Sequence, residues 1–126
     1  MVDIDSIMEL LDWNRTEEEQ ALGLKLAREV KCINVFLQPL TPAYNKNVWE
    51  NCAILLSEKS DEELSGHLFQ LMEWLQDLNW PGALCILNRL KKWEKDLMFE
   101  KTLNDCKKCA RAMDDASWEA ALQELG

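Results

Sequence analysis

Two copies of a helix-start signal, each followed by apolar residues at helical spacing, constrain this chain more than any other feature. Thr16 with Glu19 and Ser60 with Glu63 both match the capping box, in which a hydroxyl and a carboxylate satisfy free backbone N–H groups at a helix start. The residues that follow repeat their apolar positions every three or four places, which is the period of one helix face. The chain also holds 21 Leu against 9 Val plus Ile, and only 7 Gly plus Pro. This balance favours an all-α fold over sandwiches, barrels, collagen or disorder.

The apolar stripes predict about seven helices, stacked as antiparallel helical hairpins in a single domain spanning residues 1–126. Short connections between the stripes favour hairpins over widely separated helices. The residues expected to face the core, helix by helix, are Ile4, Ile7, Met8 and Leu11; Leu22, Leu26, Val30 and Ile33; Val48, Trp49, Cys52 and Leu55; Leu64, Leu68, either Leu71 or Met72, and Leu75; Leu84, Leu87, Leu90 and Trp93; Leu103, Cys106, Ala110 and Met113; and Trp118, Ala121, Leu122 and Leu125.

Capping residues and prolines set the expected helix limits. Either Asp3 or Asp5 caps the first helix, and the second runs from the first capping box to near Cys32. Two prolines make residues 38–46 the clearest loop, and the third helix follows Asn45 or Asn47. The last helix is expected to be capped near Ser117.

A shift of 64 residues aligns Ile7–Leu11 with Leu71–Leu75 and the second helix with the fifth. This is either a true repeat of two hairpins or the shared pattern of any two amphipathic helices, and the sequence leaves both interpretations open.

Charge is strongly and unevenly distributed along the chain. The net charge is −9, with −6 in residues 1–24 and +4 in residues 88–111. A negative field repels phosphate backbones and anionic membranes, so we expect neither a nucleic-acid nor a membrane partner, while a cationic protein partner is electrostatically favoured. Two solvated helix faces of opposite sign explain the asymmetry better than a dedicated binding surface does.

The cysteines and the apolar runs indicate a cytoplasmic protein. Five cysteines cannot all pair within one chain, and each lies in an apolar helical context, which is typical of reduced thiols. No basic, signal-like segment begins the sequence, and the longest unbroken apolar runs have five residues, too few to span a membrane.

The most distinctive string is Trp74 to Ala83, WLQDLNWPGA, which we interpret as a corner between two helices. Asn79 is expected to accept hydrogen bonds from the first free N–H groups, and Pro81 to fix the start of the next helix. Gly82 and Ala83 would allow a neighbouring helix to approach closely. The indoles of the two tryptophans in this string are expected to pack around the corner and to donate to Asp77 or to helix-end carbonyls. Packing alone is a sufficient explanation of the string.

This string, with NVWENCA at residues 47–53 and Ser60-Asp61, resembles a bacterial family of small all-helical proteins of unknown function that are thought to fold as HEAT-like repeats. The likeness is clearest over residues 47–90. It implies a HEAT-like α-α superhelix and no established activity. The residues that match the pattern, and that we interpret as structural more than functional, are Trp49, Asn51, Trp74, Asp77, Asn79, Trp80 and Pro81.

Candidate metal and catalytic groups are few. Cys106 and Cys109 form one C-x-x-C pair, but tetrahedral zinc needs four ligands, and the same spacing places both thiols on one helix face toward the core. His67 is the sole histidine and has no nucleophile motif around it. The four glycines never cluster into a phosphate-binding loop. We therefore expect no metal, no cofactor, no catalytic residue and no enzymatic activity.

Three functions remain as hypotheses. The first is a protein-interaction module, suggested by the hairpins and by six tryptophans. The second is an immunity-type protein that neutralises a cationic toxin, suggested by small size and acidity. The third is a sensor that binds a small ligand in a pocket walled by tryptophans.

Overall fold

The computed structural model describes residues 3–38 and 46–126, and all regular secondary structure in these ranges is helical. The all-α class expected from the sequence is confirmed, while residues 39–45 of the expected loop lie outside the described ranges. The α-helices are α1 (Ile4–Leu10), α2 (Glu17–Ala27), α3 (Trp49–Ser57), α4 (Asp61–Leu64), α5 (Leu68–Glu73), α6 (Ala83–Lys91), α7 (Leu97–Ala112) and α8 (Ala116–Gln123). The 3-10 turns are η1 (Ile33–Phe36), η2 (Lys46–Val48), η3 (Ser65–His67) and η4 (Trp74–Gln76).

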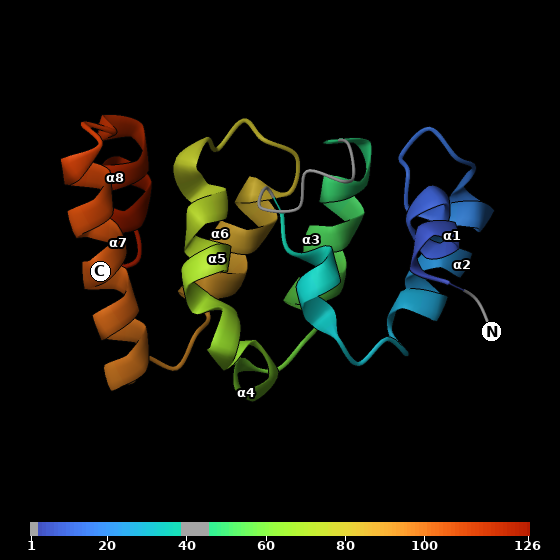
Figure 1. Ribbon diagram of the computed structural model, residues 1–126, viewed down its shortest axis with the longest axis horizontal. Helices are drawn as coiled ribbons and strands as arrows, with labels where there is room; N and C mark the ends of the chain where they lie inside the picture. The colour runs from blue at the N-terminus through green and yellow to red at the C-terminus, as the bar shows by residue number, and fades with distance from the viewer. Residues whose placement is uncertain (1–2, 39–45) are drawn as a thin grey trace.

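The helices stand side by side in a row, from α1 and α2 at one end to α7 and α8 at the other (Figure 1). Helix α1 packs on α2, α3 on α6, α5 on α7 and α7 on α8. One cluster of buried apolar side chains runs through the row, from Ile7 in α1 to Leu125 after α8. Each helix buries one face against its neighbours, as the apolar stripes require.

Side-chain caps begin three of the helices, α1, α2 and α4, at residues that the sequence indicates. Both predicted capping boxes are present, with Thr16 and Ser60 each accepting from the N3 backbone N–H at 3.1 Å. Asp3, one of the two expected caps, accepts from Ser6 N at 2.8 Å to begin α1. The expectation of a cap near Ser117 is corrected by two residues, because Asp115 accepts from Trp118 N at 3.0 Å. A carboxylate at this position also complements the helix dipole.

The second helix departs most from its predicted pattern. It ends at Ala27 instead of near Cys32, and the chain then forms η1. Its buried residues are Gly23 and Ala27, whereas Leu22 is exposed. A Cβ at Gly23 would lie 2.8 Å from the Cβ of Leu10 and 3.0 Å from Cδ2 of Leu11, so these two leucines leave no room for a side chain of α2 at this point. A glycine therefore makes the contact on the α2 side, while Leu24 and Leu26 are only partly buried.

Two other residues expected in the core are exposed, Leu84 and Met113, each at 59%. Helix α6 begins at Ala83, and the buried stripe is Ala83, Ile86, Leu87 and Leu90. This stripe has the i, i+3, i+4, i+7 spacing counted from Ala83, which leaves Leu84 one position outside it. Met113 is the C-cap of α7, where the chain turns into Asp114 at φ 55°.

The fourth expected helix forms as four short segments, α4, η3, α5 and η4. The apolar residues predicted to face inward from it, Leu64 to Leu75, are nevertheless buried. The change from α to 3-10 geometry adjusts the direction of the helix without moving its stripe away from the core. Its last turn positions Trp74 at the corner before α6.

Candidate functional site

Three of the residues in the family-like pattern meet in space. Trp49 begins α3, Trp74 lies in η4, and Trp80 lies in the turn before α6. The ring of Trp49 packs edge to face on both others, with centroids 6.3 Å from Trp74 and 5.6 Å from Trp80. Trp49 and Trp74 are buried and Trp80 is half-buried. Trp74 and Trp80, which the sequence places around the corner, are therefore joined into one cluster by Trp49, which lies between them.

Gly82 brings the corner against α3. Its φ of 84° lies in the left-handed region, and a Cβ there would be 2.6 Å from the Cβ of Ala53 and 2.9 Å from the carbonyl oxygen of Trp49. Its N–H donates to Glu50 Oε2 at 2.6 Å. Only glycine combines this backbone conformation with so close an approach. The close packing expected of Gly82 is confirmed.

The hydrogen bonds of the corner differ from those expected. Gly82, with no side-chain cap, occupies the N-cap of α6, so Pro81 lies before the cap and is not the first helical residue. Asn79 accepts no bond from the new helix; instead its own N–H donates to Asp77 Oδ1 at 2.8 Å. The Trp74 indole donates to the carbonyl of Pro81 at 3.0 Å and not to Asp77. The turn at Asp77 thus closes locally, and the left-handed Gly82 sets the direction of α6.

Asn51 connects the corner region to the N-terminal hairpin. It is buried, and its Nδ2 donates to the Leu11 carbonyl at 2.7 Å and to Gln20 Oε1 at 2.9 Å. These partners lie at the end of α1 and within α2. A buried amide with two such partners is a structural link between α3 and the first hairpin.

Lys46, which sequence analysis did not single out, completes the cluster. Its Nζ lies 5.7 Å from the ring centroid of Trp49 and 6.0 Å from that of Trp80, within the range of cation–π attraction. The indole nitrogen of Trp49 is buried without a hydrogen-bond partner. The sequence does contain a signal for this contact: Lys46 lies three residues before Trp49, and residues at i and i+3 of a helix lie on the same face.

Trp13 brings a fourth indole to the same edge of the molecule. Its backbone N–H donates to the Asn47 carbonyl at 3.1 Å, and its side chain is 47% exposed. The α1–α2 loop, the start of α3 and the α5–α6 turn all lie along the upper edge in Figure 1. We call Trp13, Lys46, Trp49 and Trp80 the tryptophan edge.

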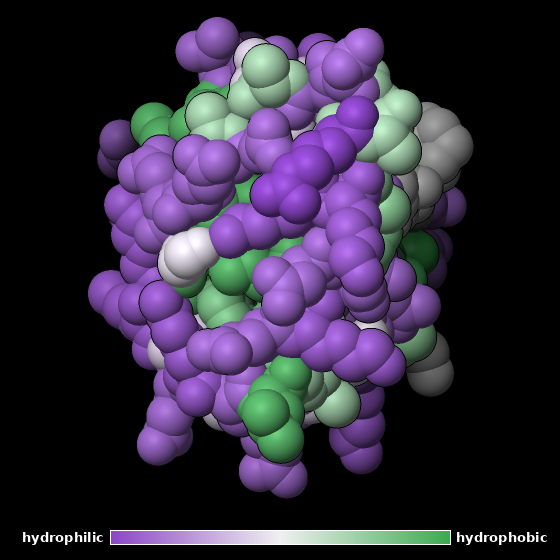
Figure 2. Space-filling model, turned by 90° about the vertical axis from the view of Figure 1, so that its left-hand side faces the viewer, coloured by the Kyte–Doolittle hydropathy of each residue, from purple (hydrophilic) through white to green (hydrophobic). Residues whose placement is uncertain are grey.

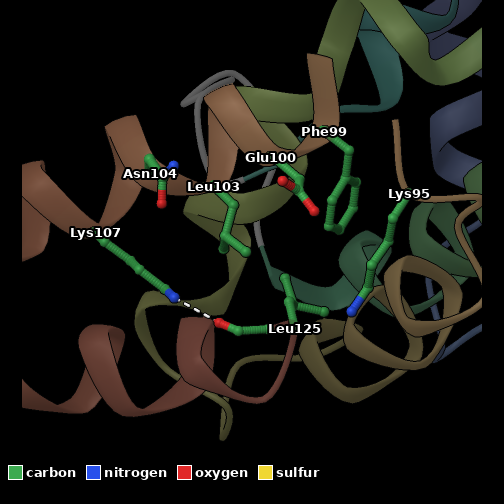
Figure 3. Close-up of a pocket in the computed structure, with 8 residues that line it drawn as sticks. Lys95, Phe99, Glu100, Leu103, Asn104, Lys107 and Leu125 are labelled. Atoms are coloured by element: carbon green, nitrogen blue, oxygen red, sulfur yellow. Dashed lines mark hydrogen bonds between the residues drawn. The ribbon is translucent and has the colours of Figure 1, made fainter. Parts of the chain in front are cut away.

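A separate groove opens between α7 and α8. Figure 2 shows a hollow with an apolar floor and a hydrophilic rim on this end of the molecule. The cavity measures about 190 Å³, and Figure 3 shows the apolar side chains of Phe99, Leu103 and Leu125 between Lys107 on one side and Lys95 on the other. Lys107 Nζ donates to the Gly126 carbonyl oxygen at 2.6 Å. Sequence analysis missed this groove because its walls come from separate helices.

The remaining candidate groups are dispersed or buried. All five cysteines are free thiols, and burial raises the pKa of Cys52 and of Cys106 to about 12, with Cys109, Glu73 and Asp105 adding to the effect at Cys106. Cys109 is half-buried beside the core. Within residues 3–38 and 46–126, no three His, Cys, Asp or Glu side chains gather as metal ligands. None of the described helices has the length and apolar character needed to cross a membrane.

Comparison with known proteins places the chain in a family. The sequence model described as Domain of unknown function (DUF5071) matches residues 46–124, which is more than half of the chain. The chain belongs to this family. No curated protein and no solved structure matches it.

The family match bears on the resemblance seen in the sequence. It confirms a family of unknown function, and its range includes all seven residues of the family-like pattern. It begins at Lys46, the first residue of η2, and continues into α8. The cluster of Lys46, Trp49, Trp74 and Trp80 is therefore within the matched region, and Trp13 lies before it.

Proposed function

We propose that this protein is a non-enzymatic protein-interaction module and that the tryptophan edge is its contact surface. One observation carries the proposal: an exposed Trp13 and a half-buried Trp80 lie along one edge of the molecule. At the same edge, the Lys46 ammonium lies near the rings of Trp49 and Trp80. Tryptophan dominates the binding energy of many interfaces because one rigid side chain supplies a large contact area. Burial raises the pKa of Cys52 and of Cys106 to about 12, so these two thiols are poor nucleophiles, since a thiol attacks as the thiolate.

The architecture supports a helical-repeat module of the HEAT-like type. Helix α1 begins at residue 4 and α5 at residue 68, while α2 ends at 27 and α6 at 91. Both pairs differ by 64 residues, the shift at which the sequence aligns with itself. We infer a duplicated unit of two hairpins, in which the tryptophan edge joins the first unit to the second.

An immunity-type role is the second candidate, because the charge near the edge favours a cationic partner. Asp12, Glu50 and Asp77 flank the tryptophans, and the whole chain carries a net charge of −9. Such a field speeds the approach of a basic protein and weakens with salt. Five free thiols support a cytoplasmic location, where thiols stay reduced.

The α7–α8 groove favours the small-ligand hypothesis in a form other than the one expected. No tryptophan lines it, so a ligand would contact Phe99 and two leucines below two lysines. Its 190 Å³ accommodates a group about the size of benzene, which is less than most ligand sites provide. We rank this role below protein interaction.

The interaction proposal is tested by affinity capture from extracts of the source cells at low salt. We expect the wild-type protein to retain a stoichiometric protein partner and Trp13→Ser to lose it. Leu97→Ser is the matched control, since Leu97 is exposed at 88% and begins α7, far along the row from the edge. Equal capture by the wild type and Trp13→Ser, or no stoichiometric partner at all, would contradict the proposal.

A further inference from the structure

We propose that the perpendicular indoles of Trp49 and Trp80 form a cage for an alkylammonium group, in which Lys46 is an internal stand-in for a lysine side chain of a partner protein. The proposal rests on the interaction function above and names the chemistry that the edge recognises. It starts from the geometry of the two rings. Their planes meet at 89° with centroids 5.6 Å apart, and the Lys46 ammonium lies within about 6 Å of both.

Two perpendicular aromatic faces are a recognised arrangement for holding a cation. The ring quadrupole directs negative potential from each face, so a cation near two such faces is attracted by both. Trp49 is fixed in this orientation by its packing on Trp74, and Trp74 is itself held by its bond to the Pro81 carbonyl. Contacts with buried residues therefore fix the orientation of Trp49, and the shape of the cage does not depend on Lys46.

Lys46 is bound weakly enough to be replaced. It is exposed and makes no ion pair or side-chain hydrogen bond with a described residue. Arg89 provides the contrast: it lies over Trp93 at 5.5 Å, and it also donates to the Lys59 carbonyl and to Asp61 Oδ1 at 2.6 Å. Arg89 is a fixed structural element, whereas among the described residues the Lys46 ammonium has only the rings of Trp49 and Trp80 as partners.

Acidic groups beside the cage favour a cationic guest. Glu50 follows Trp49 directly, and its carboxylate is held at the corner by the N–H of Gly82. Asp77 is fixed in the turn that leads to Trp80. These carboxylates would remain to balance the charge of an incoming ammonium after Lys46 has left. The occupant already present shows that the site accepts a lysine, which is why we assign lysine as the guest.

The test follows the indole N–H signals by NMR while Nα-acetyl-lysine amide is added to the full chain. We expect millimolar binding that shifts the Trp49 and Trp80 signals, assigned from single Trp→Phe variants. The cation–π contact is expected to favour the position of Lys46 over the rings, relative to positions away from them, by a factor of about two to five. The cage of the wild-type protein is then free of Lys46 for about a third to a sixth of the time. Lys46→Ala should therefore bind the probe about three- to sixfold more tightly.

Three controls make the outcome decisive. Nα-acetyl-norleucine amide, which lacks the ammonium, should bind at least several-fold more weakly, and Trp80→Leu combined with Lys46→Ala should lose binding. Lys95→Ala, which removes an exposed lysine at the α7–α8 groove, should behave as the wild type. Unchanged or weaker binding by Lys46→Ala, equal binding of the neutral probe, or shifts confined to other indoles would overturn the cage.

The same variants distinguish this proposal from the interaction function. A partner that is lost with Trp13→Ser but is captured equally by Lys46→Ala and Trp80→Leu would leave the interaction function standing and refute the cage. Probe binding at Trp49 and Trp80 without any stoichiometric partner would do the reverse. Retention of the dispersed indole signals in each variant shows that the fold is intact.

Discussion

At the scale of single residues, Gly82 has the most demanding position in the described chain. It combines a left-handed backbone with contacts to α3 that leave no room for a side chain. Gly66 is a matched glycine without these constraints, since a Cβ there would meet nothing within 4 Å. Substituting each glycine by alanine therefore distinguishes the steric requirement at Gly82 from the general effect of losing a flexible residue.

We therefore expect Gly82→Ala to lower the free energy of unfolding by about 2 to 4 kcal/mol, from the strained φ and from overpacking. Gly66→Ala should change it by less than about 1 kcal/mol. Urea denaturation of both variants provides the measurement. Similar losses from the two substitutions would show that Gly82 is not required by packing.

Glu73 gives a second residue-scale expectation, because burial raises the pKa of its carboxyl above 4.5. The folded protein then holds the proton more tightly than the unfolded chain, so this group makes stability fall as the pH rises through the folded-state pKa. Glu73→Gln should exceed the wild type in stability at neutral pH. The advantage should fade as the pH falls below 4.5, where the carboxyl is protonated in both states. A difference that is independent of pH would contradict this, as measured by urea midpoints across the acidic range.

At the scale of elements, a buried amide links the first hairpin to α3, together with the backbone bond from Trp13 to Asn47 and the ion pair of Arg28 with Glu58. The side chain of Asn51 in α3 joins the end of α1 to α2 through its two hydrogen bonds. Where Gly23 of α2 packs on Leu10 and Leu11, it supplies no side chain of its own to the contact. Removing the amide leaves the Leu11 carbonyl buried without this donor.

Asn51→Ala should therefore cost about 2 kcal/mol of stability, in addition to loosening the first hairpin. Asn88→Ala is the control, because Asn88 is exposed on α6 and should change stability by less than about 0.5 kcal/mol. Thermal and urea unfolding measure both. A neutral Asn51→Ala would mean that the remaining contacts, including the ion pair of Arg28 with Glu58, hold α3 to the first hairpin without this amide.

For whole helices, the sequence pattern predicts the capping boxes correctly but not always the face that is buried. Capping boxes at Thr16 and Ser60 were predicted correctly because a cap depends on residues within one turn. The buried face of α2 was predicted wrongly, because it depends on how closely α1 approaches. The same holds for Leu84, whose exposure follows from where Gly82 allows α6 to begin.

At the scale of the whole molecule, burial is distributed unevenly along the row. Helix α3 buries six of its nine residues, while α2 buries two of eleven. Opening the end hairpin exposes less apolar surface than opening the middle of the row, so its local stability is lower. Hydrogen exchange should show backbone amides of α2 at least about tenfold less protected than those of α3. Equal protection factors would indicate that the row unfolds as one cooperative unit.

Ion pairs that form on folding reduce the charge asymmetry seen along the sequence. The positive stretch over residues 88–111 is partly paired by α8, through Arg111 with Glu119 at 2.5 Å and Lys91 with Glu124 at 3.2 Å. These exposed pairs contribute little stability, but they reduce the positive potential at the C-terminal end. The acidic first hairpin has one ion pair of its own in the described chain, Arg15 with Glu19. The net negative character of the surface therefore prevails near the tryptophan edge.

The sequence alone predicts the all-α class, the starts of α1, α2 and α4, and the segment in which the tryptophans gather, but not the start of α3, whose N-cap is Val48 and not an asparagine. These depend on local signals, namely caps, helical periodicity and turn residues, which lie within a few positions of one another. Tertiary packing sets which face of α2 is buried, places Gly82 instead of Pro81 at the start of α6, and brings Lys46 over two indoles. It also formed the groove between α7 and α8. Each of these depends on the distance between segments far apart in the chain, which packing fixes and a helical pattern does not encode.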